Sequence, residues 1–184
     1  METLHPAVVH FAIVLPLVAL TFQALYLLKK ESAYSKSSLV TLVFTTIFML
    51  AAYLTGDKDG HTVADILSVY DAKGMEELKE HAELGFYLLI AFSVVSALKI
   101  ANIFMKKTLI EVVTLVALVV LSIATLSQGK EGGEIVYEHG TIFEAHEMKD
   151  ILKESLTDLS DSDDKDESLE ILTDAVKSAL KIEE

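Results

Sequence analysis

The sequence predicts an all-α protein, in which a four-helix transmembrane bundle is followed by a C-terminal acidic amphipathic helical tail. Four apolar segments are each close to the length of about 20 residues that a helix needs to cross a bilayer. None of them alternates strictly between apolar and polar residues, as membrane strands do. The chain also divides sharply in composition, because nearly all long apolar runs precede residue 129 and the rest is polar.

We expect the membrane spans at residues 7–28, 38–55, 82–105 and 108–127, within a membrane domain that covers residues 1–140. The first span follows an acidic residue, Glu2, with no basic stretch before it. We therefore interpret it as a membrane helix rather than a cleaved signal peptide.

The charged residues and the absence of cysteine exclude several classes of function. The net charge is −13, and all 15 basic residues are lysines, so no basic stripe suited to nucleic acid is present in the sequence. The chain has no cysteine, which excludes disulfides, thiolate metal sites, iron–sulfur clusters and covalently attached c-type haem.

The distribution of lysines predicts the orientation in the membrane. Lysines flank two short links between the spans: Lys29, Lys30 and Lys36 in the first, Lys106 and Lys107 in the second, with Lys99 nearby. By the positive-inside rule these links face the cytoplasm. Both termini and the acidic 56–80 link then face the periplasmic side of a bacterial inner membrane.

Glu111 is an acidic residue just inside the fourth span. Such a residue is either a proton or ion carrier, or an acid in the first turn of a helix that the helix dipole favours and that reaches toward the surface. We favour the second interpretation.

The residues after the fourth span are polar. The stretch "GKEGGEIVYEHG" is rich in glycine, so we expect a loop there. Beyond it, residues 141–184 carry two apolar patterns at helical spacing, separated by "SDSDDKDES". These short helices are expected to pack on each other, on the outer loop, or on a second copy of the chain as a homo-oligomer.

With this orientation, every histidine of the chain lies on the outer side: His5, His10, His61, His81, His139 and His146. Pro6 suits the first turn of a helix, which puts His5 at the helix start and His10 about one turn inside the leaflet. We expect His10 to point into the bundle at the level of His81.

The surroundings of these histidines suggest a bound group. Gly85, one turn beyond His81, leaves space for a flat group, and His139 is expected in a loop over the mouth of the bundle. Imidazoles on facing helices are common ligands of b-type haem, and they also suit copper or zinc. The candidate cofactor ligands are therefore His10, His81 and His139, with His5 as a rim or second-set ligand, and the same three histidines are the candidate metal site. Alternatively, they hydrogen-bond at the level of the lipid headgroups.

The opening "LHPAVVHF" resembles that of a bacterial family of small four-helix membrane proteins known as a domain of unknown function. Its members begin His-Pro-x-x-Val-His-Phe-Pro-Ile, and here Ala12 replaces the second proline. The stretches "EHAELG" and "GGEIVYEHG" match two further family motifs, with Ile135 where leucine is usual. The resemblance covers about residues 4–140. It implies the four-helix fold. Because similar domains occur joined to Rieske or cytochrome c modules, it also implies a link to redox chemistry.

Three functions follow as hypotheses. The first is an electron-transfer subunit that binds haem b and exchanges electrons with quinol or a periplasmic carrier. The second is a membrane protein that binds copper or zinc through its histidines. The third is a structural or interaction subunit whose tail docks a partner. No arrangement typical of a hydrolase stands out, so a stand-alone enzyme is the less favoured class.

Overall fold

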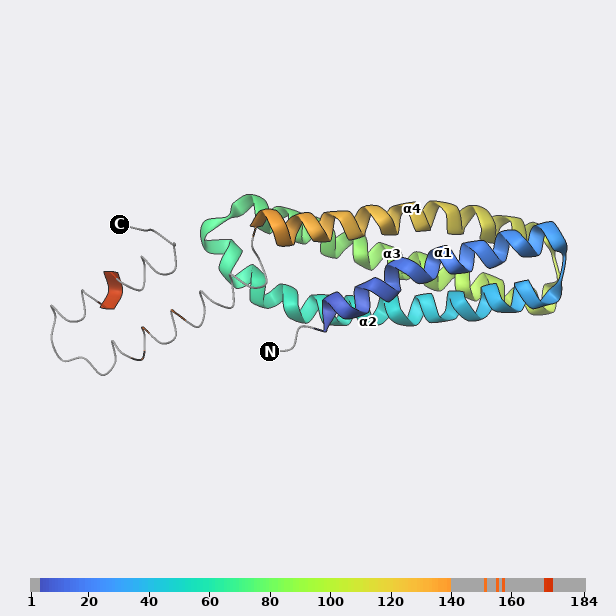
Figure 1. Ribbon diagram of the computed structural model, residues 1–184, viewed down its shortest axis with the longest axis horizontal. Coiled ribbons are helices and arrows are strands. Elements are labelled where there is room, and N and C mark those ends of the chain that lie inside the picture. The colour runs from blue at the N-terminus through green and yellow to red at the C-terminus, as the bar shows by residue number, and fades with distance from the viewer. Residues whose placement is uncertain (1–3, 140–150, 152–154, 156, 158–170, 174–184) are drawn as a thin grey trace. The chain divides into compact units, whose positions relative to one another are not determined.

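The computed structural model describes residues 4–139, 151, 155, 157 and 171–173. Four helices make up the first of these ranges: α1 (His5–Lys29), α2 (Ser32–Tyr70), α3 (Ala72–Met105) and α4 (Thr108–His139) (Figure 1). Each is long and apolar enough to cross a membrane, and the described residues contain no strand. The predicted four-helix membrane fold is confirmed.

Two tight turns bring the helices back on themselves at one end of the bundle. Lys30 and Lys106 follow α1 and α3 in the left-handed conformation, with φ of 58° and 50°. The backbone N–H of each donates to a carbonyl of the preceding turn, on Tyr26 and Asn102 respectively, as in a helix C-cap. We call this the lysine end, and the opposite end, where α1 begins, the histidine end.

At the histidine end the helices extend beyond the predicted spans. The 56–80 link was expected to be a loop, but α2 runs to Tyr70 and α3 starts at Ala72. The carboxylate of Asp71 caps α3 by accepting from the N–H of Gly74 at 2.9 Å. In the extension of α2, Val63 and Leu67 are buried, so this otherwise polar segment has one apolar face that packs against the bundle.

α4 also continues further than expected. The glycine-rich stretch from residue 129 was predicted to be a loop, and that prediction is wrong, because the helix ends only at His139. Glycine weakens a helix by about 1 kcal/mol per residue, but tertiary packing overrides this preference. Ile135 is buried in the bundle, and an ion pair between Lys130 and Glu134 joins successive turns.

An apolar core runs through the middle of the bundle. Its members are Ala12, Ala19, Leu42, Met49, Ala52, Phe92, Val95 and Leu118. The rings of Phe11 and Phe48 stack at 4.8 Å between α1 and α2. Large apolar side chains also cover the outside of the helices, such as Phe44, Val116 and Ile123. Lipid tails are the solvent that such a surface requires.

The chain divides into two compact units, Met1–Ile135 and Val136–Glu184. The first holds nearly all of the four helices. The two amphipathic helices predicted within residues 141–184 fall almost entirely outside the described residues, so the acidic tail and its role in oligomers stay a prediction.

Candidate functional site

Two histidines from different helices come together at the histidine end. His5 is the first residue of α1, and His81 lies on α3, one residue before the expected span. Both are partly buried, and the two imidazoles lie within electrostatic range of each other. Asp59 and Glu131 are within electrostatic range of His5 and His81, respectively.

Each imidazole packs against a glycine of another helix. A Cβ added to Gly56 of α2 would lie 2.7 Å from Cε1 of His5, and one added to Gly132 of α4 would lie 2.8 Å from Cε1 of His81. Side chains do not approach each other this closely, so the imidazoles occupy space that only a glycine leaves. All four helices therefore contribute to the position of this pair.

A hydrogen bond with Thr55 favours one tautomer of His5. Nδ1 of His5 lies 3.2 Å from the hydroxyl of Thr55, and that hydroxyl donates its own proton to the carbonyl of Ala51 at 2.8 Å. Because Thr55 has no second proton, it accepts from Nδ1–H of His5. The lone pair of the neutral imidazole then lies on Nε2, the atom that ligates a metal or accepts a proton.

The other imidazole is held by packing instead. Nδ1 of His81 is buried and has no hydrogen-bond partner among the residues that the structure describes. Gln128 donates from Nε2 to the backbone carbonyl of His81 at 2.7 Å, which leaves its own Oε1 buried and unpartnered. Gly85 faces this amide, since its added Cβ would lie 3.4 Å from Nε2 of Gln128. Unsatisfied buried atoms are uncommon in proteins and call for an explanation.

The structure reverses the expected positions of the first two histidines. His10 was expected to point into the bundle and His5 to lie at the rim, but His10 is exposed on the outside of α1. Its Nδ1 lies 2.5 Å from the carbonyl of Pro6, one turn earlier in the same helix. With His5 on the inside face, a residue five positions later is rotated by about 140° and points outward.

The remaining histidines are His61, His139 and His146. His61 is exposed beside Asp57, at 3.7 Å. His139 was expected in a loop, but it is the last residue of α4 and belongs to the second unit. His146 lies outside the described residues. Among the described residues, no group of three or more histidines and carboxylates is arranged to hold a metal ion.

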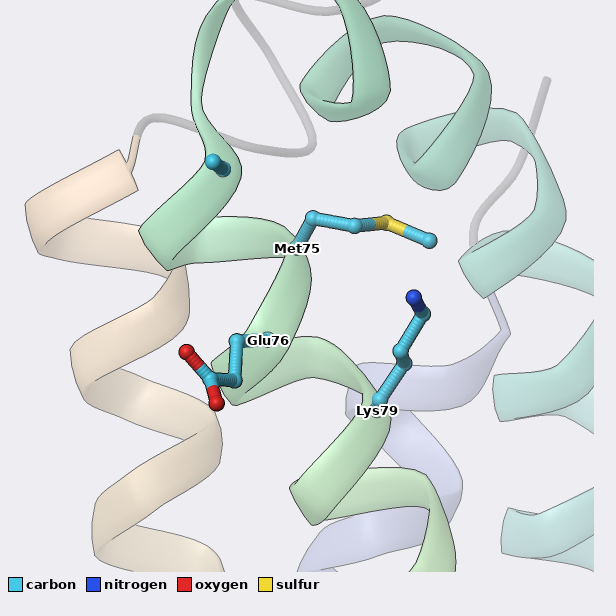
Figure 2. Close-up of a pocket in the computed structure, with 4 residues that line it drawn as sticks. Met75, Glu76 and Lys79 are labelled. Atoms are coloured by element: carbon cyan, nitrogen blue, oxygen red, sulfur yellow. The ribbon is translucent and has the colours of Figure 1, made fainter.

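A shallow pocket lies nearby, at the start of α3. Its lining residues are Ala72, Met75, Glu76 and Lys79. Figure 2 shows the side chains of Met75 and Lys79 extending to one side of the helix, while Glu76 points the other way. None of these residues belongs to the histidine pair, and the lining offers no convergent set of polar groups.

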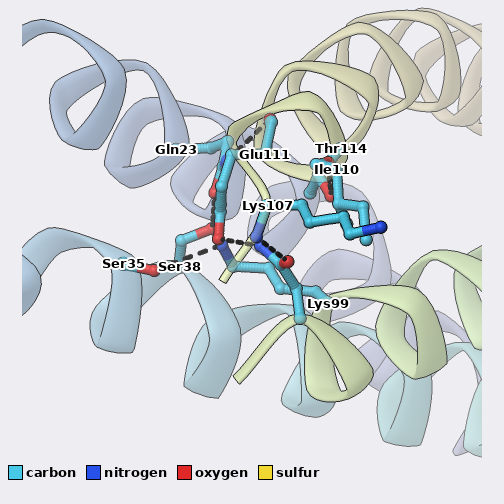
Figure 3. A network of polar contacts seen from close by, with 9 residues as sticks. Gln23, Ser35, Ser38, Lys99, Lys107, Ile110, Glu111 and Thr114 are labelled. Carbon is cyan, nitrogen blue, oxygen red and sulfur yellow. Dashed lines mark hydrogen bonds and ion pairs between the residues drawn. The ribbon is translucent and has the colours of Figure 1, made fainter. Parts of the chain in front are cut away.

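The lysine end holds a second polar cluster, which is buried in the membrane domain (Figure 3). Lys99 of α3 and Glu111 of α4 form an ion pair at 2.7 Å, and their side chains are 2% and 10% exposed. Asn102 donates to the second carboxylate oxygen of Glu111 at 2.8 Å.

Side chains of the other two helices complete this cluster. The amide of Gln23 on α1 donates to Glu111 at 2.8 Å and accepts from Lys99 at 2.7 Å. Ser38 of α2 donates to the same Gln23 oxygen at 2.9 Å. We call these five residues, Gln23, Ser38, Lys99, Asn102 and Glu111, the buried ion-pair network. It joins all four helices and satisfies the charges that it buries.

The sequence analysis missed most of this network. Lys99 was counted among the lysines that flank the membrane on the cytoplasmic side, but it is buried and paired with Glu111. Glu111 does lie in the first turn of its helix, as expected, yet it faces the bundle rather than the surface. The sequence did contain a signal for this pair. Because the link between α3 and α4 is short, Lys99 and Glu111, which lie a few residues before and after it, are placed at similar depths in the membrane.

Comparison with known proteins supports the membrane fold. A family model described as "Predicted membrane protein (DUF2231)" matches residues 1–145, so the chain belongs to this family. Comparisons with curated proteins and with solved structures found no match.

Proposed function

For this member of the DUF2231 family, we propose the function of a membrane redox subunit that holds haem b between His5 and His81. The observation that carries the proposal is the arrangement of these two imidazoles, which come from α1 and α3 to one end of the bundle and pack on glycines of α2 and α4. Haem supplies reversible one-electron transfer when it is bound.

The number of ligands favours haem over a bare ion. Haem iron takes four nitrogens from the porphyrin, so one or two ligands from the protein would be enough to hold it. A zinc ion takes three or four protein ligands, and the described residues offer no group of three. A pair of imidazoles is therefore a sufficient protein contribution for haem and an insufficient one for zinc.

The protein atoms around the pair suit the role of axial ligands. Thr55 holds the proton of His5 on Nδ1, so that Nε2 carries the lone pair for a metal, which is the usual role of a partner behind a ligating histidine. His81 has a buried ring nitrogen without a hydrogen-bond partner in the described part of the chain. Gly56 and Gly132 allow both rings to sit between the helices.

The orientation is part of the proposal. With the lysine-rich turns in the cytoplasm, the histidine end faces the periplasmic side of a bacterial inner membrane. Electrons would then be exchanged there with quinol in the bilayer or with a periplasmic carrier. This placement agrees with the acidic residues of the 56–80 segment, which lie at the same end as the pair.

The orientation can be tested directly because the chain has no cysteine. Single cysteines at Lys106 and at Gly60 report on the two ends of the bundle. In intact spheroplasts, a membrane-impermeant maleimide is expected to label Gly60→Cys and to spare Lys106→Cys until the membrane is broken. The opposite pattern contradicts the orientation but leaves the histidine pair untouched.

Haem binding is tested by the absorption spectrum of the full-length protein, purified in detergent after expression with a haem supply. We expect a Soret band and reduced α and β bands, which His81→Ala removes. Elemental analysis of the same sample gives the contrary outcomes. Stoichiometric copper or zinc without haem iron would show that the site binds a bare metal ion instead of haem. A colourless protein without metal would overturn both the haem and the metal-ion hypotheses.

A further inference from the structure

The two turns at the lysine end have lysine where a helix most often has glycine. The residue that follows a helix in the left-handed conformation is usually glycine, because a Cβ is strained there. In this protein that residue is Lys30 after α1 and Lys106 after α3, with φ of 58° and 50°. Both turns are therefore less stable than they would be with glycine, and each presents a basic side chain instead.

The helix dipole does not account for these two lysines. A lysine interacts favourably with the carbonyl end of a helix from within the last turn, where the backbone keeps its ordinary helical conformation. Lys29 already has this position in α1, whereas the last turn of α3 has no basic residue. Because the strained positions add charge that the helices do not need, we looked for a partner of this charge outside the protein.

Exposed positive charge is concentrated at this end of the bundle. The two turns and the residues next to them hold five exposed lysines, which we call the lysine patch: Lys29, Lys30, Lys36, Lys106 and Lys107. Among the residues that the structure describes, no carboxylate forms an ion pair with any of the five. Within residues 28–37 and 105–110, Glu31 is the only acidic residue. The patch is thus a basic surface on a chain whose net charge is −13.

The neighbours of the lysine patch are those of a membrane–water interface. Nζ of Lys29 lies 5.5 Å from the ring centroid of Tyr34. Nζ of Lys30 lies 5.9 Å from that of Tyr26. Tyrosines are enriched at the level of the lipid headgroups. Large apolar side chains beside the lysines are strongly exposed, namely Leu28, Phe104 and Leu109. Ammonium groups next to exposed apolar groups complement a phospholipid, in which a phosphate adjoins acyl chains.

We propose that the lysine patch binds the phosphate groups of anionic phospholipids, and that the left-handed turns at Lys30 and Lys106 present two of its ammonium groups to them. Each lysine close to an anionic membrane surface strengthens the attraction by about fivefold. A soluble phosphate compound would use the same charge but not the exposed apolar side chains beside it, so the lipid is the better match. This inference goes beyond the redox role and does not depend on haem.

The test measures which phospholipid surrounds each end of the bundle. The sequence contains no tryptophan, so Phe104→Trp on α3 places a single fluorescent reporter beside the lysine patch. Tyr87→Trp, at another exposed position of α3, reports on the half nearer the histidine end and is the matched control. The full-length variants are reconstituted into bilayers of phosphatidylcholine and phosphatidylglycerol, with bromine on the acyl chains of one lipid at a time. Bromine quenches tryptophan on contact, so the two quenching curves give the relative affinity for the two lipids.

We expect the Phe104→Trp protein to prefer phosphatidylglycerol by about fivefold or more, and the Tyr87→Trp protein to show no such preference. In the Phe104→Trp background, Lys30→Gly combined with Lys106→Gly is expected to remove most of the preference. The midpoint of thermal unfolding of this variant is expected to stay the same or rise, because glycine relieves the left-handed turns. A purely structural role of the two lysines predicts the opposite, a lower midpoint with an unchanged lipid preference.

A second pair of substitutions leaves the left-handed residues in place. Lys29→Gln with Lys107→Gln, again in the tryptophan reporter background, is expected to weaken the preference as well, since both lysines belong to the patch. Lys58→Gln with Lys79→Gln removes the same charge from exposed positions nearer the histidine end and is expected to leave the preference unchanged. Size-exclusion profiles and helical circular dichroism confirm the fold of each variant.

The contrary outcomes are equally specific. Equal affinity for the two lipids in the Phe104→Trp protein overturns the proposal, and so does a preference of the same size in the Tyr87→Trp protein. A preference that survives both pairs of substitutions in the lysine patch overturns it too. Inorganic phosphate, added at constant ionic strength because salt itself screens surface charges, distinguishes the two sources of phosphate. We expect it to leave the lipid preference intact, and its loss would show that the patch binds a soluble phosphate compound instead.

Discussion

The two ends of this bundle differ in whether their buried polar groups have hydrogen-bond partners. At the lysine end, each oxygen of Glu111 and the ammonium of Lys99 have partners within hydrogen-bond distance. At the histidine end, His81 and Gln128 each bury an atom that has no hydrogen-bond partner within the described ranges. A satisfied network stabilises the fold by itself, whereas unsatisfied buried atoms require a further partner, such as ordered water.

The largest expected effect is at the lysine end. Glu111→Ala leaves the ammonium of Lys99 buried without its counter-charge, which we expect to lower the free energy of unfolding by about 3–5 kcal/mol. Denaturant titration in detergent measures this change. Glu134→Ala, which breaks the exposed pair with Lys130, is the matched control and is expected to cost about 1 kcal/mol or less. Equal effects of the two substitutions would show that the buried network does not hold the helices together.

An intermediate effect is expected where the imidazoles pack on glycine. Gly132→Ala puts a Cβ 2.8 Å from the ring of His81, so that the ring or the helix has to shift, at about 1–3 kcal/mol. Gly133→Ala has open space around its Cβ and is expected to leave stability unchanged or to raise it slightly. The comparison needs only the midpoints of thermal unfolding, and a destabilised Gly133→Ala protein with an unaffected Gly132→Ala protein would contradict this packing.

The smallest effect concerns the hydrogen bond behind His5. Thr55→Val keeps the shape of the side chain but removes the acceptor for Nδ1–H of His5. Loss of such a partner typically weakens metal binding by about 10–100-fold, with little change in the fold. Haem titration followed by absorbance measures the affinity. Thr21→Val, at an exposed position of α1, is the control, and an equal affinity for both variants would rule out a role for this bond.

The sequence predicted the membrane fold because four apolar segments of this length admit few other structures. It did not predict the helical extensions of α2, α3 and α4, because their polar and glycine-rich residues are typical of loops. These extensions are stabilised by the burial of Val63, Leu67 and Ile135. The burial of such residues depends on neighbours that are distant in the sequence.

The candidate site was predicted in part, because the histidines of the first and third spans were singled out. The choice between His5 and His10 could not be made from the pattern, since α1 is apolar on every side and its sequence does not show which face turns inward. The inside face is set by Gly56 and Thr55, which lie on another helix. Lys99 and Glu111 were recognised as charges but not as a pair, although the short link between α3 and α4 places both residues near the lysine end.

The central claim is that His5, and not His10, acts with His81. The measurement that tests it most directly is the reduced-minus-oxidised difference spectrum of the full-length His5→Ala and His10→Ala proteins, purified side by side with equal haem supply. The account predicts that His5→Ala loses the haem bands while His10→Ala keeps them at wild-type intensity. Retention of the bands by His5→Ala together with their loss in His10→Ala would contradict it.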